Sequence, residues 1–225
     1  MSTQTTPSYA FTPPSVPSVP IVGGSQRFPV HRIYCVGRNY ADHVLEMGVD
    51  PKADPPIFFT KPADAIVLNE ATIPYPPRTN NLHYEVELVV ALGAQKQIFG
   101  YAVGNDLTRR DLQGAAKKKG QPWDTGKAFD RSAPIGAIRP ITQGPLERGR
   151  IWLTVNGELR QQSDIAQMIW SVPAIIAELA TLFELQAGDL IYTGTPAGVG
   201  PLNPGDRIEC GIEGLETLRT TIGAG

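Results

Sequence analysis

Cysteine is scarce in this chain of 225 residues, which contains only Cys35 and Cys210. Two cysteines so far apart give neither the repeated spacing of a zinc site nor a disulfide framework. Both lie in apolar stretches typical of strands, and we expect both to be reduced, buried thiols. The composition therefore argues against a disulfide-rich secreted scaffold and against a cysteine-ligated zinc module.

The chain also lacks a strong charge bias and a long apolar run. It carries 20 Lys and Arg against 22 Asp and Glu, so the composition indicates no nucleic-acid or membrane partner. The run Lys117–Lys119 is too short to change this, and we interpret it as a solvated helix end. No apolar run is long enough to cross a bilayer. Because the N-terminus resembles neither a signal peptide nor a transit peptide, we expect a cytoplasmic protein.

The length of the chain is sufficient for one substantial hydrophobic core, and nothing marks a second. Residues 1–24 are rich in Ser, Thr and Pro and predict a Pro-rich N-terminal arm, which packs on a surface or is a disordered tail. Residues 25–225 are predicted to form a single domain. Strand patterns outnumber helical ones there, which favours an α+β, mainly β fold: a mixed β-roll or sandwich with flanking helices.

The most informative stretch, from His83 to Leu92, predicts one β-strand because it is short and rich in β-branched residues. Side chains alternate faces along a strand, so Glu85 and Glu87 share a face with Val89. A strand that is apolar on both faces is usually buried on both. Two carboxylates roughly 7 Å apart there repel by about 2 kcal/mol at an effective dielectric near 20. Either one carboxyl group stays protonated or a cation lies between them.

Another acidic residue lies at the end of the next predicted strand. Residues 93–97 predict a hairpin loop, after which residues 98–103 return as a strand towards Asp106. If the strands pair outwards from the loop without interruption, Glu85 lies opposite Asn105. Asp106 would then face away, so it can join the glutamates only if the strand ends or bulges at Asn105.

A cluster of Glu85, Glu87 and Asp106 would offer only oxygen ligands. Such a set suits Mg²⁺ or Mn²⁺, with Ca²⁺ as a further option, rather than zinc. The alternative is an exposed edge strand whose two glutamates are solvated. Spacing alone leaves both interpretations open.

A histidine and a carboxylate occur close together earlier in the chain. His43 and Glu46 are three residues apart in a predicted helix that begins near Asn39 and ends before Gly48, so they are neighbours on one helical face. A carboxylate beside a histidine fixes its tautomer and raises its basicity, as a general base requires. A surface pair of little energetic weight is the alternative.

Seven motifs, taken together and in this order, resemble the fumarylacetoacetate hydrolase family. No single motif is specific, but the combination is, and the similarity extends from about Arg32 to the C-terminus. The motifs are Gly37–Tyr40 with His43 and Glu46, Phe59–Pro62, Tyr84–Glu87, Asn105–Gln113, Lys119–Trp123 with Lys127, Val155–Glu158, and Gly188–Pro196 with Gly198–Gly200.

The resemblance implies a β-roll-like catalytic domain that works as a homodimer, with one divalent metal ion, Mg²⁺ or Mn²⁺, in each active site. It assigns Glu85, Glu87 and Asp106 as the metal ligands. It also assigns His43 and Glu46 as a catalytic dyad in which the carboxylate orients the histidine.

The reaction that the resemblance implies is hydrolysis of a carbon–carbon bond in a 2,4-diketo acid, an acylpyruvate. The short chain and its Pro-rich arm are most similar to members that convert fumarylpyruvate to fumarate and pyruvate in aromatic-compound degradation. Lys127, as a catalytic residue, and Gln113 match family positions that stabilise an oxyanion. The candidates for binding the substrate carboxylates are Arg38, Lys61, Arg110 and Thr195.

Two other functions stay open at this point. One is a different reaction at the same metal site, namely isomerisation of a 5-carboxymethyl-2-hydroxymuconate-type acid or decarboxylation of oxaloacetate. The His43 and Glu46 dyad favours hydrolysis because it can activate water, although it does not exclude decarboxylation. The other is a non-catalytic, metal-dependent binder of small dicarboxylates, against which the complete set of acid, base and cation argues.

Overall fold

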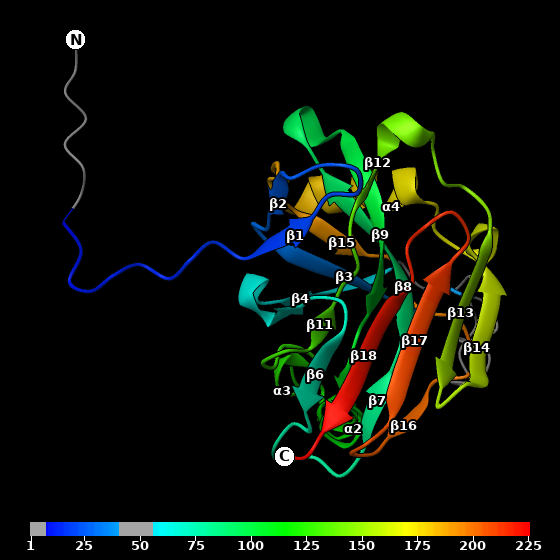
Figure 1. Cartoon of the computed structure of the whole chain (residues 1–225). Coiled ribbons are helices and arrows are strands. Elements are labelled where there is room, and N and C mark those ends of the chain that lie inside the picture. The colour runs from blue at the N-terminus through cyan, green and yellow to red at the C-terminus, as the bar shows by residue number, and fades with distance from the viewer. Residues whose placement is uncertain (1–7, 41–55) are drawn as a thin grey trace.

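A computed structural model of the protein describes residues 8–40 and 56–225. Two β-sheets packed face to face form its body (Figure 1). The six-stranded sheet has the order β12 (Arg139–Pro140), β9 (Ile98–Asn105), β8 (Val86–Leu92), β15 (Leu190–Tyr192), β3 (Ile33–Gly37) and β4 (Ile57–Lys61). The five-stranded sheet has the order β14 (Glu158–Asp164), β13 (Arg150–Val155), β17 (Arg207–Ile212), β18 (Leu218–Gly223) and β6 (Ala71–Pro74).

Smaller elements surround these sheets. Three short sheets consist of β1 (Ser18–Pro20) with β2 (Arg27–Pro29), β10 (Thr108–Arg109) with β7 (Leu82–Tyr84) and β16 (Gly200–Leu202), and β11 (Ala133–Pro134) with β5 (Ile66–Val67). The α-helices of the described residues are α2 (Arg110–Lys119), α3 (Asp124–Lys127) and α4 (Val172–Leu182). The 3₁₀ turns are Ala63–Ala65, Ala94–Lys96, Ile141–Gln143 and Ile165–Gln167. The prediction of an α+β, mainly β fold is confirmed.

Strand β8 is buried along its whole length and separates two hydrophobic cores. Its alternate residues, such as Leu88 and Val90, join the core between the two large sheets, together with Leu153 of β13. Val89 and Ala91 face the opposite way, into a second core beneath β1 and β2. The expected burial on both faces is therefore correct, and it explains why the sequence of this strand is almost continuously apolar.

The prediction of one continuous strand from His83 to Leu92 is wrong, because the chain divides at Glu85. Residues 82–84 form β7 and pair with β10 and β16, whereas β8 begins at Val86 and pairs with β9 and β15. The break lets Glu85 lie where two sheets meet. The predicted helix that contains His43 and Glu46 lies outside the described residues.

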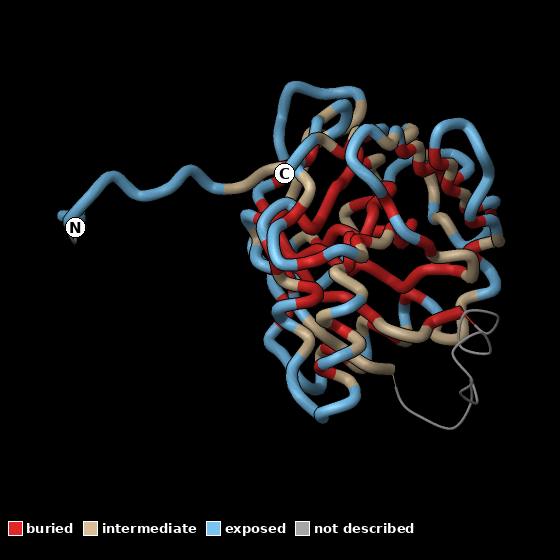
Figure 2. Tube along the Cα trace, turned by 90° about the horizontal axis from the view of Figure 1, so that it is seen from below, coloured by how far each residue is buried: buried red, intermediate tan, exposed pale blue. Residues whose placement is uncertain are grey.

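Within residues 8–24, the N-terminal arm contacts the body at its C-terminal end. Residues 8–16 are exposed and extend away from the sheets (Figure 1 and Figure 2). Val19 of β1 is fully buried in the second core, and Val22 donates a backbone hydrogen bond to the Ile138 carbonyl. The division of the chain into an arm of residues 1–24 and a domain of residues 25–225 stays a prediction.

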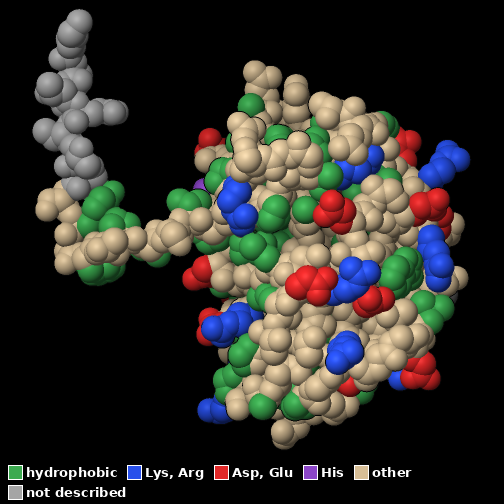
Figure 3. All heavy atoms as spheres, in the orientation of Figure 1, with side chains coloured by type: hydrophobic (Ala, Val, Ile, Leu, Met, Phe, Trp, Pro, Cys, Tyr) green, Lys and Arg blue, Asp and Glu red, His purple; other side chains and the backbone are tan. Residues whose placement is uncertain are grey.

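The remaining predictions from composition can be compared with the structure directly. Cys35 and Cys210 are both free and buried, as expected. Positive and negative side chains are interspersed on the face that Figure 3 shows, without a field of one sign. Within residues 8–40 and 56–225, no helix is long and apolar enough to cross a membrane.

Gly104 of β9 provides a test of how tightly the second core is packed. A Cβ atom at this position would lie 2.5 Å from Val89 Cγ2 and 2.6 Å from Tyr192 Cε1. We expect Gly104→Ala to lower the free energy of unfolding by about 1–3 kcal/mol, measured by urea denaturation, because the overpacked core must shift. In the control Gly114→Ala, where nothing lies within 4 Å, the better helix propensity of Ala should leave stability equal or higher by up to about 1 kcal/mol. Equal stability of Gly104→Ala and the wild type would contradict this description of the core.

Candidate metal centre and active site

The carboxyl groups of Glu85, Glu87 and Asp106 converge. One oxygen of each lies within 4.8 Å of the others, and all three residues are buried. Glu85 occupies the junction of β7 and β8, Glu87 is the second residue of β8, and Asp106 directly follows β9. The predicted cluster therefore forms at the common end of the β8–β9 hairpin, and the alternative of a solvated edge strand is wrong.

A β-bulge brings Asp106 to the correct face. Leu92 pairs with Ile98 as predicted, but Ala91 pairs with Gly100, so that Phe99 is an extra residue in β9. A shift of one residue exchanges the two faces of a strand. As a result Val86 lies opposite Asn105, and the Asp106 N–H donates to the Glu85 carbonyl over 2.8 Å. β9 ends at Asn105 as required, but the bulge lies at Phe99, beside the hairpin loop.

Three cationic side chains compensate the charge of this cluster. Lys127 Nζ lies 2.8 Å from Glu85 Oε2 and 2.6 Å from Asp106 Oδ2. Lys61 Nζ lies 2.8 Å from Asp106 Oδ1, and Arg110 pairs with the other oxygen of Glu85. Although burial lowers the pKa of Lys127, the two carboxylates outweigh it and raise that pKa, which keeps Lys127 protonated.

Glu87 is the carboxylate without such a cation at contact distance among the described residues. Its Oε2 accepts a hydrogen bond of 2.9 Å from the Gly194 N–H. Burial, followed by repulsion from Asp106 and Glu85, raises the pKa of Glu87 well above its usual range. A divalent cation among the three carboxylates would favour the ionised form of Glu87 and so lower its pKa.

The approach of the Gly194 N–H to Glu87 depends on the absence of a side chain at residue 194. Gly194 has φ +98°, and a Cβ atom there would lie 2.7 Å from Asn39 Cβ. Asn39 in turn donates from its side chain to the Thr193 carbonyl over 2.7 Å. The glycine-rich segment after β15 is thus fixed against the acidic cluster, and it places Thr195 beside it.

The donor set fits a hard divalent cation. It consists of three buried carboxylates from rigid sheet ends, with no sulfur and no imidazole ligand within it. Oxygen-only sets of this kind suit Mg²⁺ and Mn²⁺, and Ca²⁺ also accepts them. The cluster therefore suits a divalent metal site.

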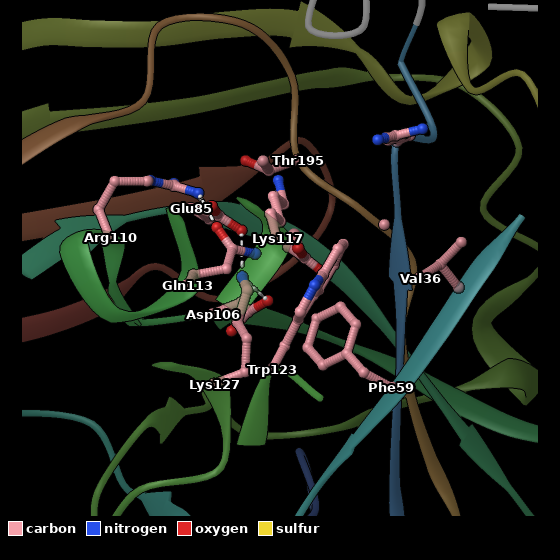
Figure 4. A pocket seen from close by; sticks show the side chains of 13 residues that line it. Val36, Phe59, Glu85, Asp106, Arg110, Gln113, Lys117, Trp123, Lys127 and Thr195 are labelled. Carbon is pink, nitrogen blue, oxygen red and sulfur yellow. Dashed lines mark hydrogen bonds and ion pairs between the residues drawn. The ribbon is translucent and has the colours of Figure 1, made fainter. Parts of the chain in front are cut away.

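A pocket opens over the cluster and has an empty volume of about 370 Å³, part of it open to solvent (Figure 4). Five of the site residues predicted from the sequence line it beside the acids: Arg38, Arg110, Gln113, Lys127 and Thr195. Arg110 donates to Gln113 Oε1 over 2.7 Å. Thr195 Oγ1 accepts a hydrogen bond of 2.8 Å from Gln161, which lies outside this group. His43 and Glu46 lie outside the described residues.

Lys61 differs from the other predicted substrate-binding residues in its position. Its side chain is fully buried behind Asp106, where it also donates to the backbone carbonyls of Leu107 and Lys127. It does not belong to the lining of the pocket. Lys61 therefore contacts Asp106 directly but does not line the pocket.

Sequence reasoning assigned no site role to five residues that line the pocket: Val36, Gly37, Phe59, Lys117 and Trp123. The run Lys117–Lys119 does end helix α2, and Lys118 and Lys119 are exposed as expected, but Lys117 Nζ lies 4.7 Å from the centroid of the Trp123 ring within the pocket. Burial, and then repulsion from Arg110, lower the pKa of Lys117 from its usual 10.5 to about 8. The signal was present in the spacing, since residues 110, 113 and 117 share one face of a helix.

Comparison with known proteins identifies the relatives of this chain. A model of the family described as fumarylacetoacetate (FAA) hydrolase C-terminal matches residues 32–223. A fumarylpyruvate hydrolase of a Ralstonia species is 45% identical over 185 residues, which cover 78% of this chain and 96% of that protein. The mitochondrial oxaloacetate tautomerase FAHD1 of Mus musculus is 44% identical over 201 residues, covering 84% of this chain and 90% of the relative.

A solved structure is also closely similar. The crystal structure of fumarylpyruvate hydrolase from Pseudomonas aeruginosa in complex with Mn²⁺ and pyruvate superposes with a TM-score of 0.95 and is 47% identical. The match covers 97% of this chain and all of that one. The predicted family resemblance is confirmed, and so is the expected divalent metal cofactor.

Addition of metal to metal-free protein tests the acidic cluster. Mn²⁺ at about 100 times its dissociation constant should stabilise the fold by about 2.7 kcal/mol. In a chain of this length that raises Tm by roughly 5–10 °C, measured by scanning calorimetry after EDTA treatment. We expect Glu87→Gln to lose most of the shift because one ligand charge is removed, whereas the exposed Glu158→Gln should keep it. An unchanged shift in Glu87→Gln would contradict a metal site at this cluster.

Proposed function

Because the chain belongs to the FAA hydrolase family, we propose that it is a metal-dependent hydrolase that cleaves a carbon–carbon bond of an acylpyruvate, with fumarylpyruvate as the substrate and fumarate and pyruvate as the products. The observation that carries the proposal is the buried carboxylate cluster beneath a pocket lined with cations. The fumarylpyruvate hydrolases of the Ralstonia species and of P. aeruginosa support this choice of substrate.

In this proposal Glu85, Glu87 and Asp106 hold the divalent ion. When bound, the ion supplies Lewis acidity that stabilises negative charge on the oxygens of a 2-oxo acid. The three carboxylates come from the ends of two paired strands, so their positions are set before any ligand arrives. Lys61, held against Asp106 in the interior, acts on that carboxylate rather than on the substrate.

Lys127 has the position and charge to stabilise an oxyanion. Its ammonium group is held at 2.7 Å from Thr108 Oγ1 and between two carboxylates, which fixes its direction and its protonation. A donor fixed in this way loses little free energy in reorganisation when charge develops on the substrate. Gln113 can share this role as an amide donor from the neighbouring helix.

His43 and Glu46 complete the proposal through the family resemblance alone. His43 takes a proton from water at a ring nitrogen, and Glu46 accepts a hydrogen bond from the other nitrogen. The resulting hydroxide attacks the C4 carbonyl carbon, distal to the carboxylate of the pyruvate part. The bond between C4 and C3 then breaks, fumarate is released, and the electron pair stays on the pyruvate part as its enolate. Protonation of C3, by the proton that His43 has taken from water, gives pyruvate. Arg38, Arg110 and Thr195 bind the carboxylate of the pyruvate part from the pocket walls.

Tautomerisation of oxaloacetate is the second candidate. The observation in its favour is the mouse oxaloacetate tautomerase, which matches this chain about as closely as the Ralstonia hydrolase does. Both reactions need negative charge to be stabilised on the oxygens of a 2-oxo acid, so the acidic cluster serves either one. Hydrolysis of an acylpyruvate also requires activation of water, whereas tautomerisation of oxaloacetate does not. An isomerase or decarboxylase acting on a related acid is distinguished from the hydrolase in the same way.

A homodimer and a cytoplasmic location, both expected from the sequence, stay part of the proposal. Light scattering in solution would determine the oligomeric state.

Identification of products is the primary test of the proposed reaction. Metal-loaded protein should be incubated separately with fumarylpyruvate, acetylpyruvate, oxaloacetate and a hydroxymuconate, and the products identified by NMR. We expect fumarate and pyruvate from fumarylpyruvate at the highest kcat/KM. Conversion of oxaloacetate between its keto and enol forms, or isomerisation of the hydroxymuconate, without any cleavage of the acylpyruvates, would replace the hydrolase by the second candidate.

Replacement of His43 separates catalysis from binding. A positioned general base contributes typically 10²- to 10⁴-fold to the rate, so His43→Ala should lower kcat for fumarylpyruvate by about that factor. The Mn²⁺-induced rise in Tm should stay the same, because the carboxylate cluster is retained. Turnover at the wild-type rate in His43→Ala would show that another group activates the water.

A further inference from the structure

One face of helix α2 carries three polar side chains into the pocket: Arg110, Gln113 and Lys117 (Figure 4). Because a helix rises 1.5 Å per residue, Lys117 lies about 10 Å further along the axis than Arg110. Arg110 pairs with Glu85, so it lies at the end of the pocket next to the carboxylate cluster. Lys117 therefore adds a further cation to the pocket lining, from the last turns of the same helix.

A row of aromatic groups lies in the pocket between Lys127 and Lys117. Lys127 Nζ lies 5.0 Å from the centroid of the Phe59 ring, and Phe59 packs against Trp123 with the ring centroids 5.8 Å apart. Lys117 Nζ lies over the other ring, 4.7 Å from the centroid of Trp123. Two lysines thus mark the ends of a surface formed by two aromatic rings.

The two lysines differ in their partners. Lys127 is held by Glu85 and Asp106, whereas Lys117 has neither an ion pair nor a hydrogen bond within residues 8–40 and 56–225. An ammonium group that is partly removed from water without a carboxylate costs free energy. Its neighbours in the sequence, Lys118 and Lys119, are exposed to solvent. An anionic ligand group at Lys117 would offset this cost.

We propose that Lys117 binds the second carboxylate of the substrate, the one distal to the metal-binding 2-oxo acid end, and thereby selects dicarboxylic over monocarboxylic acylpyruvates. The inference rests on the proposed function and names a specificity residue for it. The unsaturated carbon chain between the two anionic ends lies along Phe59 and Trp123. Binding of the far carboxylate at Lys117 gives this ammonium group an ion pair, which it lacks within residues 8–40 and 56–225.

A pair of 2-oxo acids that differ only at the distal end tests this inference without requiring cleavage. 2-Oxoadipate carries a distal carboxylate, and 2-oxohexanoate ends in a methyl group. We expect Mn²⁺-loaded wild-type protein to bind 2-oxoadipate more tightly, measured by isothermal titration calorimetry. Lys117→Met should weaken binding of 2-oxoadipate by roughly 10- to 100-fold, as expected for one charge-assisted contact, and leave 2-oxohexanoate binding unchanged.

Two further variants make the result specific. Lys117→Arg should restore most of the preference for 2-oxoadipate, because it keeps a cation over Trp123. Lys118→Met removes an exposed lysine from the same helix and should bind both ligands as the wild type does. An unchanged preference in Lys117→Met, or an equal loss for both ligands, would overturn the inference.

Steady-state kinetics give a second readout when cleavage occurs. Lys117→Met should raise KM for fumarylpyruvate by roughly the same 10- to 100-fold while kcat and the kinetics with acetylpyruvate stay unchanged. If the wild type cleaves no acylpyruvate but Lys117→Met still loses the preference for 2-oxoadipate, the proposed reaction fails and the role of Lys117 stands. If cleavage occurs and the preference persists in Lys117→Met, the assignment of Lys117 fails alone.

Discussion

Mutual repulsion among three buried carboxylates is the constraint on which the rest of this site depends. Glu85, Glu87 and Asp106 are buried, and one carboxylate oxygen of each lies within 4.8 Å of the others. Such a cluster is stable only if positive charge surrounds it or protons neutralise it. Lys127, Lys61 and Arg110 supply part of that charge, and a divalent metal ion can supply the remainder.

The two-sheet body explains how the carboxylates are kept in place against this repulsion. The hairpin of β8 and β9 is packed on both faces, so its end cannot move to separate the acids without disturbing two cores. Gly194 and Lys127 approach from elements distant in sequence and bind the same cluster by direct contacts. A rigid scaffold of this kind suits a metal ion such as Mg²⁺, which demands nearly ideal ligand geometry.

The relatives of this chain suggest how one site serves several reactions. A fumarylpyruvate hydrolase and an oxaloacetate tautomerase match this chain at similar identity, 45% and 44%. In the function proposed for this chain, the acidic cluster and its cations stabilise negative charge on a 2-oxo acid. We propose that discrimination among substrates falls to other groups of the pocket, such as the aromatic rings of Phe59 and Trp123 and the ammonium group of Lys117.

Much of the fold and of the site could be predicted from local pattern. The apolar run of β8, the hairpin that follows it and the carboxylates at its end were all recognisable, because strand alternation and turn residues act over a few positions. The resemblance added the roles of residues such as Lys127, whose loop has no periodicity. The break at Glu85 was not recognisable, because the residues before and after it belong to different sheets.

Local pattern was enough to identify the residue types that could hold a metal ion and to predict burial of the apolar strand on both faces. Packing places the extra residue of β9 at Phe99, which turns Asp106 towards Glu85. The same packing places Lys61 behind the carboxylates and Lys117 in the lining of the pocket. Register and side-chain environment depend on contacts with elements distant in the chain, whereas spacing reports only on neighbours.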